Sequence, residues 1–60
     1  MIMIFEDYVA AVLFTLINEY DCSKDEAVAL FKKYAGDFSK CFENDASVAT
    51  CACEIYNYDN

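Results

Sequence analysis

The four cysteines, Cys22, Cys41, Cys51 and Cys53, are the residues of this 60-residue chain best suited to chemistry. Four-thiolate zinc sites usually pair their ligands at C-x2-4-C spacing, whereas Cys51 and Cys53 are separated by a single residue. A secreted disulfide scaffold is disfavoured because no basic region precedes the first apolar run. We therefore expect reduced thiols, no metal and no cofactor. A disulfide joining Cys22 or Cys41 to Cys51 or Cys53 is the alternative, and a metal site is a second.

Catalytic arrangements are missing from the sequence. Nucleophilic catalysis needs a base, most often His, and the chain has no His. The acidic pairs Glu6-Asp7 and Asp25-Glu26 are chain neighbours, and such side chains diverge by about 100° on a helix. They suit the positive end of a helix dipole better than acid–base catalysis. A single glycine cannot form a phosphate-binding loop. We expect no catalytic residue and no enzyme.

Charge and length limit the partners of the protein. Eleven acidic residues against four lysines give a net charge of −7, which disfavours direct nucleic-acid binding and favours a protein partner with a basic surface. The apolar run from Tyr8 to Ile17 is only ten residues long, whereas a membrane span needs ~20. We expect no membrane insertion and a single domain over residues 1–60.

Helical periodicity runs through the chain, and the near absence of turn residues disfavours a β fold. We predict an all-α bundle of two long and two short helices, spanning Ile4–Tyr20, Lys24–Ala35, Asp37–Glu43 and Ala46–Tyr56. We expect residues 57–60 to fray. The predicted core contacts are Phe5, Leu13, Leu16, Leu30, Phe31, Phe38, Phe42 and Ile55.

Local signals predict the helix boundaries. Ser23 and Glu26 have the spacing of a capping box, which begins the second helix. Gly36, the only glycine, suits the left-handed residue that ends a helix. Asp37 is then expected to cap the third helix, and Asn44-Asp45 to end it and to offer the next cap.

Phe14 does not fit the buried stripe of the first helix. At 100° per residue it lies nearly opposite Val9. It is either covered by the fourth helix or the tail, or it belongs to an exposed apolar patch with an acidic rim, which is typical of an interface. The candidate partner-binding residues are Phe14, Ala10, Ile17, Asp7, Glu6 and Glu19. Interfaces are also rich in tyrosine, and we expect Tyr8, Tyr56 and Tyr58 at the surface.

Residues 10–38 resemble the DUF3791-type short bacterial proteins of unknown function. The resemblance is carried by Ile17-Asn18-Glu19-Tyr20 and by Ser23-x-x-Glu26-Ala27-x-x-Leu30-Phe31-Lys32-Lys33-Tyr34. It implies a small helical accessory protein of bacteria, often encoded near toxin-like genes, with no activity of its own. The C-terminal third, with its Cys-Ala-Cys, departs from that pattern. In size and charge alone the chain is similar to phage-encoded anti-CRISPR proteins.

These features predict a non-enzymatic, acidic protein-binding module in the cytoplasm of a bacterial host cell. We expect it to inhibit or modulate a larger partner, as anti-defence proteins of phages and mobile elements do. Three alternatives remain open: a DNA mimic, a structural homodimer and a toxin-associated accessory protein. A mimic needs carboxylates in rows, whereas here they are interleaved with lysines.

Overall fold

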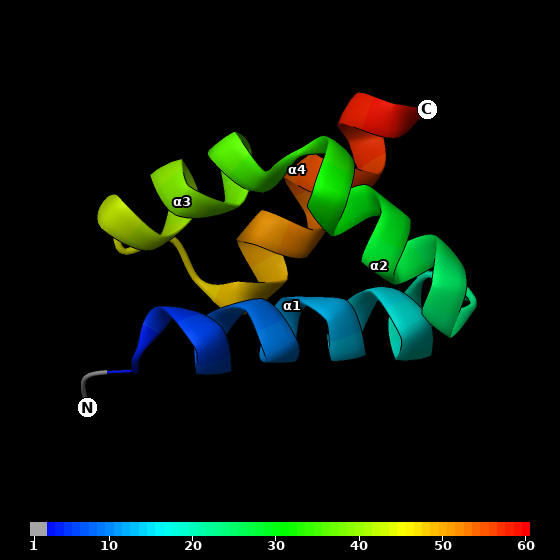
Figure 1. The fold of residues 1–60 in the computed structure, drawn as a ribbon, viewed down its shortest axis with the longest axis horizontal. Helices are drawn as coiled ribbons and strands as arrows, with labels where there is room; N and C mark the ends of the chain where they lie inside the picture. The colour runs from blue at the N-terminus through cyan, green and yellow to red at the C-terminus, as the bar shows by residue number, and fades with distance from the viewer. Residues whose placement is uncertain (1–2) are drawn as a thin grey trace.

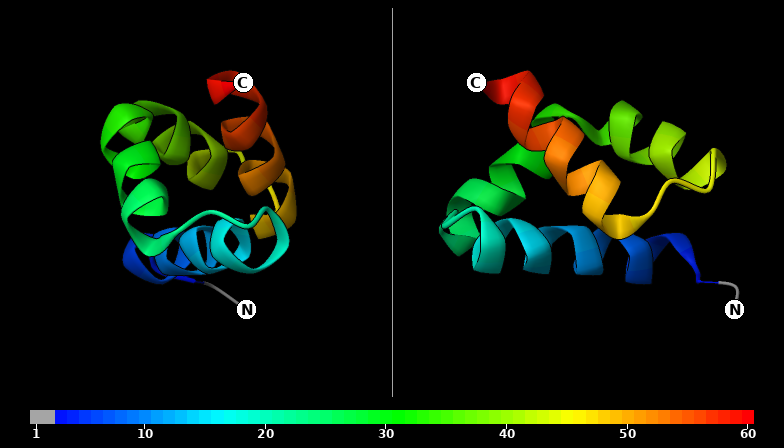
Figure 2. Two further views of the ribbon diagram at one scale, coloured as in Figure 1. Left: turned by 90° about the vertical axis from the view of Figure 1, so that its right-hand side faces the viewer. Right: turned by 180° about the vertical axis from the view of Figure 1, so that it is seen from behind.

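The computed structural model describes residues 3–60, which form four helices and no strand. The helices are α1 (Phe5–Glu19), α2 (Lys24–Lys33), α3 (Ala35–Glu43) and α4 (Val48–Asp59). Helix α1 forms one side of the molecule, and the other three helices all lie on the same side of it (Figure 1). The end-on and rear views show the same arrangement (Figure 2). The predicted all-α fold of two long and two short helices is thus confirmed at the level of fold class.

Helix α2 begins at the predicted capping box. The Ser23 hydroxyl accepts a hydrogen bond from the Glu26 amide at 3.1 Å, and the Ser23 amide donates to Glu26 Oε1 at 2.8 Å. Two amides that the first helical turn leaves unpaired are thereby satisfied. The expected start of this helix is confirmed.

The junction between α2 and α3 differs from the prediction. Only Tyr34 separates the two helices, and Gly36 lies inside α3 with a negative φ. The turn is made at Tyr34 itself, with φ −115° and ψ 31°, and its carbonyl accepts from the amides of Asp37 and Phe38. This conformation does not require a glycine. The left-handed role of Gly36 and the capping role of Asp37 are therefore both wrong.

Within residues 3–60, aspartates and not the glycine supply the left-handed residues. Asp21 has φ 57° and follows α1, while Asp45 has φ 58° and follows α3. At the second site the Ala46 amide donates to the Cys41 carbonyl and the Asp45 amide to the Phe42 carbonyl. This is the hydrogen-bond pattern of a Schellman motif, which satisfies the last carbonyls of α3. The predicted end of α3 at Asn44-Asp45 is confirmed.

Helix α4 begins and ends later than predicted. Its N-cap is Ser47, whose hydroxyl accepts from the Thr50 amide at 3.1 Å, so the helix begins at Val48 rather than at Ala46. It continues to Asp59, beyond the predicted end at Tyr56. Residues 57–59 are helical, and Asp59 Oδ1 accepts from Lys33 Nζ at 3.0 Å and from the Tyr34 hydroxyl at 3.2 Å. These contacts join the end of α4 to the end of α2.

The core lies between α1 and the three helices that cover it. Of the predicted core residues, Leu16, Leu30, Phe38 and Ile55 are buried, and the rest are half-buried against them. Phe42 makes edge contacts with the rings of Phe5 and Tyr8. Tyr8, expected at the surface, is only 6% exposed. Its ring fits the core because its hydroxyl finds a carbonyl partner in the turn between α3 and α4.

The four cysteines differ in burial. Cys41 and Cys51 are buried in the core, Cys53 is exposed, and Cys22 is half-buried. All four thiols are unpaired in the structure. The Cys41 thiol donates to Glu54 Oε2 at 3.3 Å, and burial is the main cause that raises the pKa of this thiol to about 12. A thiol that stays protonated is a poor nucleophile and a poor metal ligand. The reduced state in solution stays a prediction.

Candidate functional site

The outer face of α1 is the side that no other helix covers. Val12 and Leu16 point into the core and are fully buried, and α2, α3 and α4 all pack from their side (Figure 2). Phe14 lies about 160° around the axis from Leu16 and is 67% exposed. Neither α4 nor the C-terminal residues cover Phe14, so its side chain is exposed.

The neighbours of Phe14 on this surface are the ones that helical spacing predicted. Ala10 lies one turn before Phe14 and is exposed, and Ile17 lies one turn after it and is half-buried. Asp7 is exposed two turns before Phe14, at nearly the same angle around the axis. We call these four residues, Asp7, Ala10, Phe14 and Ile17, the Phe14 face. Exposed Glu6 flanks it at about 80° from Phe14.

Glu19 does not belong to the Phe14 face. It is exposed, but five residues after Phe14 a helix has turned by about 140° from the starting direction. Its charge acts instead near Tyr20. The pKa of Tyr20 is raised first by a hydrogen bond with Cys53, then by burial, and Glu19 adds to the rise. On the grounds of helix geometry, Glu19 is therefore removed from the predicted partner-binding residues.

The surface tyrosines also separate from this face. Tyr8 is buried, and Tyr56 is half-buried with its ring 4.7 Å from that of Tyr20. Tyr58 is 56% exposed, but α4 ends on the side of the molecule away from the outer face of α1 (Figure 1). No tyrosine adds to the Phe14 face.

The Phe14 face offers an apolar anchor beside negative charge. Asp7 is the ionisable residue of this face, and Glu6 adds a second carboxylate at its flank. The nearby Asn18 amide is occupied, because it donates to the Phe14 carbonyl at 2.8 Å. Such a surface can bind a complementary apolar pocket with basic residues around it.

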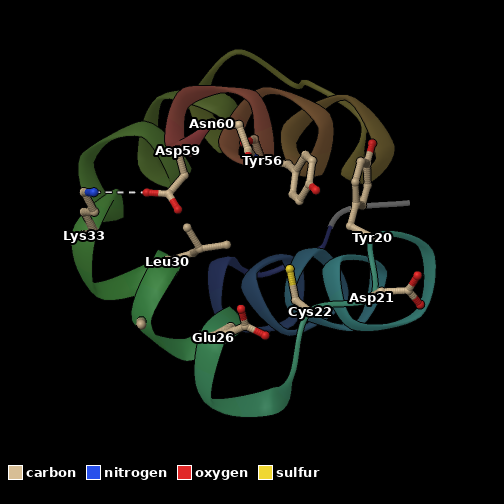
Figure 3. Close-up of a pocket in the computed structure, with 10 residues that line it drawn as sticks. Tyr20, Asp21, Cys22, Glu26, Leu30, Lys33, Tyr56, Asp59 and Asn60 are labelled. Carbon is tan, nitrogen blue, oxygen red and sulfur yellow. Dashed lines mark hydrogen bonds and ion pairs between the residues drawn. The ribbon is translucent and has the colours of Figure 1, made fainter.

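A cleft on another part of the molecule was not foreseen from the sequence (Figure 3). It has a volume of about 510 Å³ and lies between the end of α1, one side of α2 and the end of α4. Its walls are built from Tyr20, Asp21, Cys22, Glu26, Ala29, Leu30, Lys33, Tyr56, Asp59 and Asn60. These residues run from Tyr20 to Asn60 along the chain, so no local pattern could have grouped them.

Two further properties concern residues 3–60 only. In this range no group of three or more Cys, Asp or Glu side chains is placed to hold a metal ion. In the same range every helix is too short or too polar to cross a membrane.

Comparison of the chain with protein families, with curated proteins and with solved structures finds no match.

Proposed function

We propose that this protein is a non-catalytic binding module that inhibits or modulates a larger protein through the Phe14 face. The observation that carries the proposal is the 67% exposure of Phe14 on the uncovered side of α1. Burying a Phe side chain contributes about 1.5–3 kcal/mol. In the protein alone the Phe14 side chain is exposed to water and does not make this contribution. Burial of the side chain against a partner would provide it.

Charge determines which kind of partner fits. With a net charge of −7, two copies of the chain repel each other. A partner with basic residues around an apolar pocket is attracted by Asp7 and Glu6 while Phe14 enters the pocket. A heterologous protein partner therefore fits this face better than a second copy. It also fits better than DNA mimicry, because two carboxylates do not make a phosphate-like row.

The biological setting is a proposal that rests on size, charge and the lack of catalytic groups. A 60-residue acidic helical chain suits an inhibitor of a bacterial defence system, of the anti-CRISPR type, acting in the host cytoplasm. The targets of such inhibitors handle nucleic acids and so carry basic surfaces.

Substitution of Phe14 tests the proposal. Immobilised wild-type protein and the variant Phe14→Ala are exposed to host extract, and a protein held only by the wild type is then purified and titrated. We expect Phe14→Ala to weaken the purified complex by tenfold or more, about 1.4 kcal/mol, as for a central anchor. The thermal unfolding midpoint should be unchanged, because the side chain contributes little to the core.

Tyr58→Ala is the matched control, since Tyr58 is another exposed aromatic residue, on a different face. It should leave the affinity unchanged. Equal binding by wild type and Phe14→Ala would contradict the proposal. If light scattering instead finds a dimer that Phe14→Ala dissociates, the face is a self-association surface.

A further inference from the structure

The cleft between α1, α2 and α4 has the size of a site for a small ligand. Leu30 and Cys22 point into it from α2 and from the loop before α2 (Figure 3). The rings of Tyr20 and Tyr56 stand together on another side, with centroids 4.7 Å apart and an angle of 36° between their planes. An aliphatic chain can lie against this apolar and aromatic lining, and a cation gains from an aromatic neighbour.

Two carboxylates from different helices also reach the cleft: Glu26 of α2 and Asp59 of α4 (Figure 3). Each uses one oxygen within the described residues. Glu26 Oε1 accepts from the Ser23 amide, and Asp59 Oδ1 accepts from Lys33 and Tyr34. The second oxygen of each is left to accept from a bound molecule.

Both carboxylates are held in the ionised form. The hydrogen bond from the Ser23 backbone lowers the pKa of Glu26, and the hydrogen bond from Lys33 lowers the pKa of Asp59. Both groups therefore carry their negative charge at neutral pH.

The ends of two helices reinforce the negative potential of the cleft. Tyr20 is the C-cap of α1 and Asn60 that of α4, and both line the cleft. The C-terminal end of a helix carries partial negative charge and favours cations. Burial raises the pKa of the half-buried Cys22 thiol, and Glu26, Asp21 and Asp59 add to the rise. Lys33 is the single cation of the lining.

We propose that this cleft binds an organic cation of side-chain size, an ammonium or guanidinium group on an aliphatic stem. The stem lies against Leu30 and the Tyr20–Tyr56 pair, and the cation is attracted by the carboxylates of Glu26 and Asp59 in the lining. A metal ion is not the occupant, since these side chains do not converge as ligands within residues 3–60. The proposal is independent of the Phe14 face, because the two surfaces share no residue.

The probe is n-pentylammonium, titrated into the isotopically labelled full chain at low salt and followed by amide chemical shifts. We expect saturable shifts at Tyr20, Cys22, Leu30 and Tyr56, with neutral pentan-1-ol and anionic pentanoate binding at least about tenfold more weakly. Equal binding of pentan-1-ol and pentylammonium, or no saturable shift at these residues, would overturn the proposal.

Three variants localise the cation. Glu26→Gln removes the charge, and Gln can still complete the capping box. Asp59→Asn removes the other charge. Each should weaken pentylammonium binding by about threefold or more, as expected for the loss of one partly exposed charge contact. Glu43→Gln, an exposed carboxylate outside the cleft, is the matched control and should have no effect. If all three variants bind alike, the assigned position of the cation is wrong.

A second titration distinguishes two sources of such a cation: a lysine side chain of a protein and a free alkylamine. A lysine blocked at both ends, with N-acetyl and N-methylamide groups, is titrated in parallel. If it binds as tightly as pentylammonium, the cleft accepts a lysine side chain presented by a protein. If its backbone prevents binding, the ligand is a free alkylamine.

Discussion

The Tyr8 hydroxyl donates a 2.7 Å hydrogen bond to the carbonyl of Ala46, a residue 38 positions further along the chain. The bond joins the first half of α1 to the turn that connects α3 and α4. Burial is the first cause that raises the pKa of Tyr8, followed by the charge of Cys51. The phenol therefore stays protonated and keeps donating across the ordinary pH range.

Tyr8→Phe tests this bond. The substitution keeps the ring contact with Phe42 but leaves the Ala46 carbonyl without its side-chain donor. We expect the free energy of unfolding, measured by urea titration, to fall by about 1–3 kcal/mol. Tyr58→Phe removes an exposed hydroxyl and should change stability very little. If the two variants lose the same amount, the Tyr8 bond contributes no more than a surface hydroxyl.

Gly36→Ala distinguishes the structure from the sequence-based interpretation. In the structure Gly36 is helical with a negative φ, and a Cβ added there meets no atom within 4 Å. Alanine should therefore stabilise the protein by about 0.5–1 kcal/mol, because it restricts the unfolded chain. If Gly36 were left-handed, the substitution by alanine would instead destabilise the protein. The reverse change at the neighbouring position, Ala35→Gly, should destabilise by a similar amount in the same thermal unfolding assay.

The buried Cys41 thiol predicts a loss of stability at alkaline pH. Its pKa is raised from 9.0 to about 12 on folding, so the unfolded chain loses this proton first. The stabilising contribution is fully present below pH 9.0 and falls as the pH rises toward 12, at up to about 1.4 kcal/mol per pH unit. Urea titrations between pH 8 and about pH 11 measure this slope.

Cys41→Val removes the titrating group and should make the slope shallower, whereas Cys53→Ala removes an exposed thiol and should leave it unchanged. Burial also raises the pKa of the Cys51 thiol. Part of the decrease in stability with pH should therefore persist in both variants. An identical slope in the wild type and in Cys41→Val would show that the Cys41 thiol is not protected by the fold.

Local sequence determined that the chain is helical, where α2 begins and in which direction Phe14 points from α1. The Ser23–Glu26 capping box needs only four consecutive residues, so it could be recognised before any tertiary contact was known. Helical periodicity likewise placed Phe14 opposite the buried stripe, because a regular helix fixes that angle whatever it packs against. By the same geometry, Glu19 should have been left out of the Phe14 face.

Tertiary structure decided the features that depend on residues distant in the chain. Asp59 joins the end of α4 to Lys33 and Tyr34, and no pattern within residues 57–60 predicts these contacts. Tyr8 is buried because a carbonyl of a distant turn accepts its hydroxyl. Phe14 is exposed because all three other helices pack on one side of α1 (Figure 1). Periodicity gives the direction of a side chain, whereas only the packing of the other helices determines whether anything covers it.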